Sequence, residues 1–152
     1  MEIKEKMLES RFGIEIEMTG ITRSEAANIV AATVMGNKNY VGGQYDKWEV
    51  RQEDGRKWSI VYDGSILTRR KSGNTHISAG STYSVELVSP ILTYRQDIET
   101  LQEIVRALRK GGAISKPELQ CGIHIHLDGE PHTPLSIRNF INIIASKNDL
   151  LY

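Results

Sequence analysis

The sequence has few of the features that would assign it to a membrane, secreted or nucleic-acid-binding class. Its single cysteine, Cys121, rules out an internal disulfide framework and suits a reducing compartment. No run of about 18 apolar residues could span a membrane, and no apolar segment near the N-terminus is typical of a secretory signal. The 19 basic and 19 acidic residues cancel, whereas nucleic-acid-binding domains usually carry a basic excess. We therefore expect a cytoplasmic protein that engages neither nucleic acid nor a membrane.

Common catalytic motifs are also missing. The chain has no Walker loop, no Rossmann fingerprint, no Gly-x-Ser-x-Gly elbow and no His-Glu-x-x-His helix. The 152 residues suffice for one domain, and 39% hydrophobic with 25% charged residues allow both a core and a solvated surface. Any activity must therefore come from a less local arrangement of side chains in a single domain over residues 1–152.

The order of predicted elements indicates an α+β fold. Alternation of period two predicts strands, apolar spacing of three and four predicts helices, and an Asp-Gly pair predicts a hairpin turn. The expected strands are 11–18, 48–52, 57–62, 83–88 and 121–128, the expected helices are 22–35, 97–110 and one from Leu135, and 69–82 reads as a mobile loop. Because hairpin signals dominate the middle of the chain, we expect a largely antiparallel sheet with helices packed on one face.

The alternation assigns each strand of this sheet an apolar and a polar side. In 121–128, Cys121 falls with Ile123, Ile125 and Leu127, which predicts that these four face the core. The last helix is expected to turn an apolar stripe inward, made of Ile137, Phe140, Ile141 and Ile144.

Acidic and histidine side chains occupy the polar sides of three strands. Glu15 and Glu17 are spaced i and i+2, roughly 6.5–7 Å apart on a strand, and so are His124 and His126. Glu86 holds the equivalent side of its own strand. Carboxylates suit hard cations and imidazoles suit metals or phosphates. The alternative for each strand alone is a solvated face, which is ordinary for an antiparallel sheet.

Three further groups invite a functional interpretation. Cys121 with the two histidines has the look of a zinc motif, but alternation turns the thiol away from both imidazoles, which favours a buried inert cysteine. The turn containing Asp63 and Ser65 lies at a strand end, where a substrate could reach it. The basic residues at 69–71 could clamp phosphates, although such runs are more often solvated.

Four segments in this order resemble the amidoligase family of carboxylate–amine ligases, relatives of glutamine synthetase and glutamate–cysteine ligase. The segments are FGIEIE at 12–17, VYDGSI at 61–66, VELVSPIL at 85–92 and CGIHIHLD at 121–128. The resemblance runs from about Arg11 to Tyr152. It implies a glutamine-synthetase-like curved antiparallel sheet with helices on its convex side.

The resemblance also implies a chemistry and a set of roles. The reaction would be ATP-dependent amide formation between a carboxylate and an amine, small molecules or peptides, through an acyl phosphate. Glu15, Glu17, Glu86 and His124 would hold Mg²⁺ or Mn²⁺, with Glu17, Glu86 and His124 catalytic. Glu15, His124 and His126 would approach the nucleotide, and Asp63 and Ser65 would line the substrate side.

Members of that family are usually longer than this chain. The final residues 147–152 lack a helix stop signal, so we expect the N-terminal part of a longer catalytic domain or a short degenerate homologue. Two functions compete with the ligase: a non-catalytic metal- or nucleotide-binding module, and a metal-assisted hydrolase or phosphotransferase on the same sheet.

Overall fold

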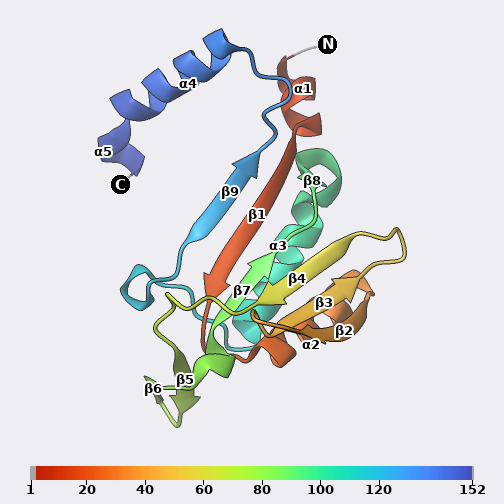
Figure 1. The fold of residues 1–152 in the computed structure, drawn as a ribbon, viewed down its shortest axis with the longest axis vertical. Coiled ribbons are helices and arrows are strands. Elements are labelled where there is room, and N and C mark those ends of the chain that lie inside the picture. The colour runs from red at the N-terminus through yellow and green to blue at the C-terminus, as the bar shows by residue number, and fades with distance from the viewer. Residues whose placement is uncertain (1–2, 152) are drawn as a thin grey trace.

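A computed structural model describes residues 3–151 of the chain, and its centre is a seven-stranded antiparallel sheet. The strands follow the order β2-β3-β4-β7-β1-β8, with β9 also paired to β1 (Figure 1). The α+β class and the largely antiparallel sheet predicted from the sequence are confirmed. The sheet strands are β1 (Arg11–Met18), β2 (Asn37–Gly42), β3 (Lys47–Arg51), β4 (Lys57–Val61), β7 (Val85–Val88), β8 (Leu92–Thr93) and β9 (Ile123–Leu127).

Strand β1 lies between β7 and β8 on one side and β9 on the other. Phe12 pairs with both Leu92 and Leu127, so β8 and β9 must flank it from opposite sides. Ile16 is shared in the same way by β7 and β9. The polar positions of β1 therefore have neighbours from two other strands, which is how this sheet gathers a site.

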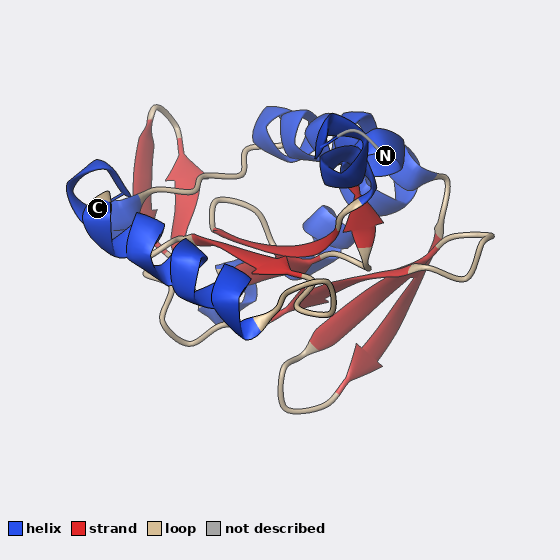
Figure 2. Cartoon of the chain, turned by 90° about the horizontal axis from the view of Figure 1, so that it is seen from above, coloured by secondary structure: helices blue, strands red, loops and turns tan. Residues whose placement is uncertain are grey.

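Two helices cover one face of the sheet and form the core with it. α2 (Arg23–Val34) packs on β3 and β4, and α3 (Tyr94–Lys110) packs against α2 and β8, a layer visible in Figure 2. The predicted capping box at the start of α2 is present, with Thr22 and Glu25 bonding each other's backbone. The core comprises residues such as Val30, Trp58, Ile60, Leu87 and Ile104. Burial of these side chains supplies most of the driving force for folding.

The remaining helices are peripheral. They are α1 (Ile3–Glu9), α4 (Pro134–Ser146) and α5 (Asn148–Leu151), with 3₁₀ turns at η1 (Ser81–Tyr83) and η2 (Pro117–Leu119). None of the helices in the described part of the chain combines the length and apolar character needed to cross a bilayer.

Helix α3 begins earlier than its apolar periodicity predicts. Its first residue is Tyr94, three positions before the expected start at Asp97. The buried Asp97 carboxylate accepts the Thr93 N–H at 2.8 Å and the Arg56 Nη1 at 2.5 Å. Asp97 thus caps the first turn from inside the helix, which satisfies an amide that would otherwise lack a partner.

The segment 69–82 is ordered secondary structure, so the prediction of a mobile loop was wrong. β5 (Arg69–Ser72) and β6 (Thr75–Ser78) form an antiparallel hairpin, with Gly73 at its turn in the left-handed region (φ 59°). Thr19 fixes its base, because its hydroxyl donates to the Arg69 carbonyl at 3.1 Å and accepts the Arg69 N–H at 2.8 Å. Backbone pairing, rather than apolar alternation, orders this segment. Arg70 and Lys71 are solvent-exposed on it, and Arg69 is half-buried.

The apolar sides of β9 and α4 are exposed, contrary to the prediction that they face the core. Ile123, Ile125 and Leu127 are 58%, 63% and 61% exposed. Ile137, Phe140 and Ile141 are also exposed and Ile144 is half-buried, because α4 lies beyond β9, away from α2 and α3 (Figure 1). Alternation does place the apolar side chains of β9 opposite the histidines, but within residues 3–151 the helical layer ends at α3. A groove of about 710 Å³ follows its edge, lined by residues including Ile14, Ile16, Leu101, Val105 and Ile123.

Candidate active site

Three neighbouring strands bring the predicted acidic and histidine side chains onto the sheet face opposite α2 and α3. The register pairs Glu17 of β1 with Glu86 of β7, and Glu15 of β1 with His124 of β9. Partners directly opposite in an antiparallel ladder carry their side chains on the same face. The i, i+2 pattern of each strand therefore becomes a two-dimensional patch of polar groups.

The first cluster joins one residue from each of these strands. Glu15, Glu86 and His124 each offer a ligand atom, and these atoms all lie within 4.8 Å of one another. Glu15 stands between the two histidines: its Oε2 is 3.1 Å from His124 Nδ1 and its Oε1 is 3.1 Å from His126 Nε2. His126 thus contacts the first cluster through Glu15.

The second cluster is Glu17, Asp63 and Glu86, again with ligand atoms within 4.8 Å of one another. Glu17 is 6% exposed, and its Oε2 accepts the Gly122 N–H at 2.7 Å. Glu86 belongs to both clusters. The six predicted residues other than Ser65 therefore form one connected patch, in which Glu86 is the shared carboxylate.

Asp63 was assigned to the substrate side by resemblance, and the structure adds its membership of a possible cation-binding group. β4 pairs with β7 through Val61 and Glu86, and Asp63 lies two residues beyond Val61, on the same side of the strand. Knowledge of that strand pairing would have placed Asp63 beside Glu86. The sequence alone did not show that β4 is the neighbour of β7.

Ser65 contributes to the site through its backbone. Its N–H donates to Asp63 Oδ1 at 2.7 Å, which closes the turn after β4, while its side chain is exposed. Asp63 and Glu86 also line a cavity of about 350 Å³ together with Gln44, Tyr45 and Tyr62. A ligand that reached the second cluster could extend into this cavity.

The proximity of the carboxylates alters the proton affinity of two groups. The pKa of Glu86 is raised, first by burial and then by the negative charges of Glu15, Asp63 and Glu17. The pKa of His124 is raised, chiefly by its hydrogen bond to Glu15 and further by the charges of Glu17 and Glu86. The negative charge of neighbouring carboxylates contributes to both shifts, and a bound cation would relieve that part.

Cys121 takes no part in either cluster among the described residues. Its side chain is buried, as predicted, and burial raises the pKa of the thiol. A thiol with a raised pKa is a poor nucleophile at neutral pH. The structure therefore disfavours both the zinc motif and a cysteine nucleophile.

Comparison with protein families agrees with the geometry. Residues 8–152 match the family model described as "Putative amidoligase enzyme". The chain belongs to the amidoligase family. No curated protein and no solved structure matches the chain significantly.

Proposed function

We propose that the chain provides the catalytic face of an ATP-dependent carboxylate–amine ligase that works with Mg²⁺ or Mn²⁺. The observation that carries the proposal is the pair of clusters that share Glu86 on an open sheet face in an amidoligase-family chain. In this proposal the sheet has the curvature of the glutamine-synthetase fold, with the clusters on its concave side.

The donor set fits hard divalent cations. Four carboxylates and one imidazole supply the ligand atoms of the two clusters, and oxygen-rich sites of this kind suit Mg²⁺ and Mn²⁺. Glu15, Glu86 and His124 would hold one cation, and Glu17 and Glu86 would hold a second with Asp63. When bound, such cations neutralise the charge on ATP phosphate oxygens during phosphoryl transfer.

The reaction we assign has two displacements. An oxygen of the substrate carboxylate attacks the γ-phosphorus, and ADP leaves. The amine nitrogen then attacks the carbonyl carbon of the acyl phosphate, inorganic phosphate departs, and the nitrogen loses a proton. Glu17, Glu86 and His124 act at the phosphoryl group, His126 and Glu15 lie towards the nucleotide, and Asp63 and Ser65 lie towards the substrate.

Hydroxylamine allows the test to proceed before the natural amine is known, because it intercepts acyl phosphates as hydroxamates. The purified chain would be given ATP, Mg²⁺, hydroxylamine and a panel of amino acids and short peptides as carboxylates. We expect ADP and hydroxamate in equal amounts for at least one acid. Glu17→Gln should abolish both products, and Glu99→Gln, the same change on the exposed surface of α3, should not.

Two other results would contradict the ligase and favour another function. Phosphate release that needs neither acid nor hydroxylamine would indicate a hydrolase. Nucleotide binding without ADP formation for any acid would indicate a binding module.

A further inference from the structure

We infer that Ser84, itself held by the buried Arg23, is a positioning residue that sets the place of Asp63 in the second cluster. The inference rests on the proposed function, because it assigns to Ser84 a role in cation binding at that site. Neither Ser84 nor Arg23 is one of the three residues of the second cluster. Ser84 bonds the backbone of Asp63, and Arg23 bonds the backbone of Ser84.

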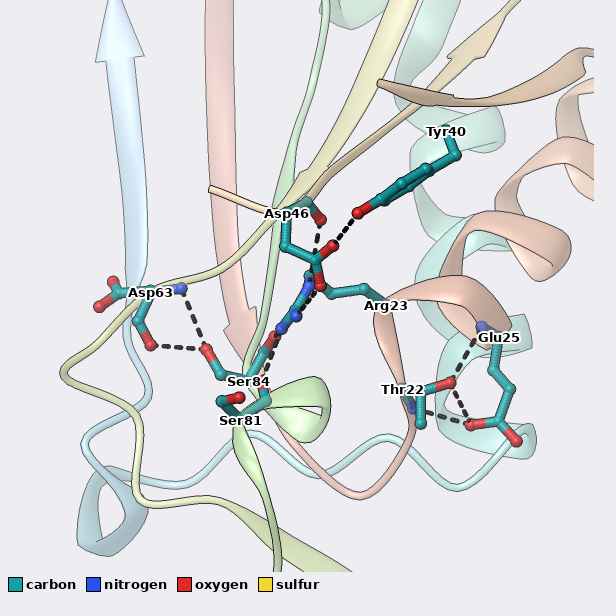
Figure 3. Close-up of polar contacts among 8 residues, drawn as sticks. All are labelled: Thr22, Arg23, Glu25, Tyr40, Asp46, Asp63, Ser81 and Ser84. Atoms are coloured by element: carbon teal, nitrogen blue, oxygen red, sulfur yellow. Dashed lines mark hydrogen bonds and ion pairs between the residues drawn. The ribbon is translucent and has the colours of Figure 1, made fainter. Parts of the chain in front are cut away.

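Ser84 continues the β4–β7 ladder after the backbone pairing has ended. The last paired residues are Val61 and Glu86, and the same antiparallel register places Asp63 opposite Ser84. There the Ser84 hydroxyl replaces the backbone N–H and C=O groups that would pair with Asp63 in a regular ladder. It accepts the Asp63 N–H at 3.0 Å and donates to the Asp63 carbonyl at 2.5 Å (Figure 3).

The Ser84 side of these two part-buried bonds is shielded from water. Ser84 is 0% exposed, so its hydroxyl has no solvent to replace a lost partner, and an unmatched polar group there would be costly. The pair therefore fixes both polar groups of the Asp63 backbone. The Ser65 N–H on Oδ1 then orients the Asp63 carboxylate from the other side of the turn.

Arg23 secures Ser84 in turn. Its Nη1 donates to the carbonyls of Ser84 and Ser81, each at 2.6 Å, which clamps both ends of η1. The guanidinium also forms an ion pair with Asp46, whose Oδ1 accepts the Tyr40 hydroxyl at 2.6 Å (Figure 3). With 4% exposure, Arg23 is a buried charge that is paired with Asp46 and hydrogen-bonded to backbone carbonyls.

The start of α2 explains why Arg23 is an effective anchor. Arg23 is the first residue of the helix, immediately after the N-cap Thr22 and its capping box with Glu25 (Figure 3). A capped helix end has little freedom, so the guanidinium projects from a rigid base. The series α2, Arg23, Ser84, Asp63 thus transmits the position of the helical layer to the site on the opposite face.

The contacts from Arg23 through Ser84 to Asp63 lead only to the second cluster. Asp63 contributes to the cluster with Glu17 and Glu86, whereas Glu15, Glu86 and His124 form theirs without it. Loss of the Ser84 hydroxyl should therefore weaken one class of cation site and spare the other.

The test is Mn²⁺ binding to the whole chain, measured by calorimetry and by the electron paramagnetic resonance of free Mn²⁺. Ser84→Ala should weaken one class of site about fivefold, the equivalent of one hydrogen bond. Ser81→Ala is the matched control, since Ser81 is exposed and contacts Arg23 through its carbonyl, and it should bind as the wild type does. Asp46→Asn should cause a smaller loss in the same direction. Asparagine tolerates the positive φ of 43° at that position, so this variant serves if Ser84→Ala does not fold.

A double-mutant cycle separates positioning from general destabilisation. In the Asp63→Asn background, Ser84→Ala should have no further effect on Mn²⁺ binding, because its target is already lost. An equal loss in both backgrounds, or wild-type binding by Ser84→Ala, would overturn the inference.

Amide hydrogen exchange distinguishes this inference from the proposed function. If the wild type binds no Mn²⁺, the proposed function fails. Exchange at the Asp63 N–H then decides the positioning role alone, since it should accelerate at least tenfold in Ser84→Ala and stay unchanged in Ser81→Ala. An unchanged rate in Ser84→Ala would overturn it.

Discussion

Glu17 and Gly122 are joined by two hydrogen bonds that run in opposite directions. The Glu17 N–H donates to the Gly122 carbonyl at 3.1 Å, and the Gly122 N–H donates to Glu17 Oε2 at 2.7 Å. The second bond fixes one carboxylate oxygen and leaves Oε1 on the side of His124, 3.9 Å from its Nε2. A buried acidic side chain is thereby held in a single orientation at the centre of the site.

Substituting Glu17 by glutamine should separate fold from cation binding. The amide oxygen of glutamine can still accept the Gly122 N–H, so the free energy of unfolding should change by less than about 1 kcal/mol. The loss of charge should lower Mn²⁺ affinity at least about tenfold, a difference of about 1.4 kcal/mol. Calorimetry and denaturant unfolding measure the two quantities. If Glu17→Gln binds Mn²⁺ as tightly as Glu99→Gln does, Glu17 is not a ligand.

Glu86 should make the cation-free protein less stable as pH rises. Its pKa is raised above the ordinary 4.5 by burial and by neighbouring carboxylates. Between 4.5 and the raised value the folded chain binds more protons than the unfolded chain, so the free energy of unfolding falls through that window. Above the window the loss is complete. Glu86→Gln removes this loss and should be more stable than the wild type at pH 7, with the difference vanishing at lower pH.

Denaturant unfolding in a chelator across the acidic to neutral range checks this dependence. Excess Mg²⁺ should reverse the order of stability at pH 7, because a cation stabilises the ionised Glu86 of the wild type. Glu53→Gln, in the exposed turn between β3 and β4, should show neither effect. A stability difference for Glu86→Gln that stayed constant with pH would contradict the assignment.

Local patterns in the sequence predict most of the fold. Alternation locates β1, β3, β4 and β7, and the capping box locates the start of α2, because these signals depend on residues close together in the chain. β2 escapes prediction since its residues, NKNYVG, are mostly polar and exposed, and its order comes from backbone pairing with β3. Alternation also tells which side of β9 is apolar. Whether another element covers that side depends on tertiary packing, which no local pattern encodes.

For the candidate site, too, local patterns identify the residues but do not show how the strands come together. Glu15, Glu17, Glu86 and the histidines are recognisable because each pair or residue occupies the polar side of its own strand. Their convergence depends on β1 lying between β7 and β9, which the sequence does not state. Ser84 gives no signal at all: it is a small polar residue whose importance arises from the register opposite Asp63 and from burial.

His124 should extend the rise of cation affinity with pH beyond the acidic range in which a site made of carboxylates alone would titrate. Its hydrogen bond to Glu15 raises its pKa above the ordinary 6.5, and the imidazole must lose its proton to bind a metal. Mn²⁺ affinity should therefore continue to rise as pH passes 6.5 and level off above the raised pKa. Histidine ring NMR should find that Glu15→Gln lowers the pKa of His124, while Glu99→Gln leaves it unchanged. If Glu15→Gln also left the pKa of His124 unchanged, the hydrogen bond would not be the cause of the raised pKa.

Because the apolar side of β9 is exposed, substitutions there should change the free energy of unfolding little. Ile125 is 63% exposed and Ile60, in β4, is 0% exposed, so the same substitution tests two environments on two strands of one sheet. Ile60→Ala should lower the free energy of unfolding by about 2–5 kcal/mol, because it leaves a cavity in the core. Ile125→Ala should cost less than about 1 kcal/mol, since little burial is lost.

The relation of Ile125 to α4 decides how that result is interpreted. Phe140 on α4 is 48% exposed, so Phe140→Ala and Ile125→Ala should have additive effects on unfolding by denaturant. A large cost for Ile125→Ala that disappears in the Phe140→Ala background would mean that α4 packs on β9 in solution. The apolar stripe of α4 and the groove beside α3 would then meet, and the exposed arrangement of these two elements would be refuted.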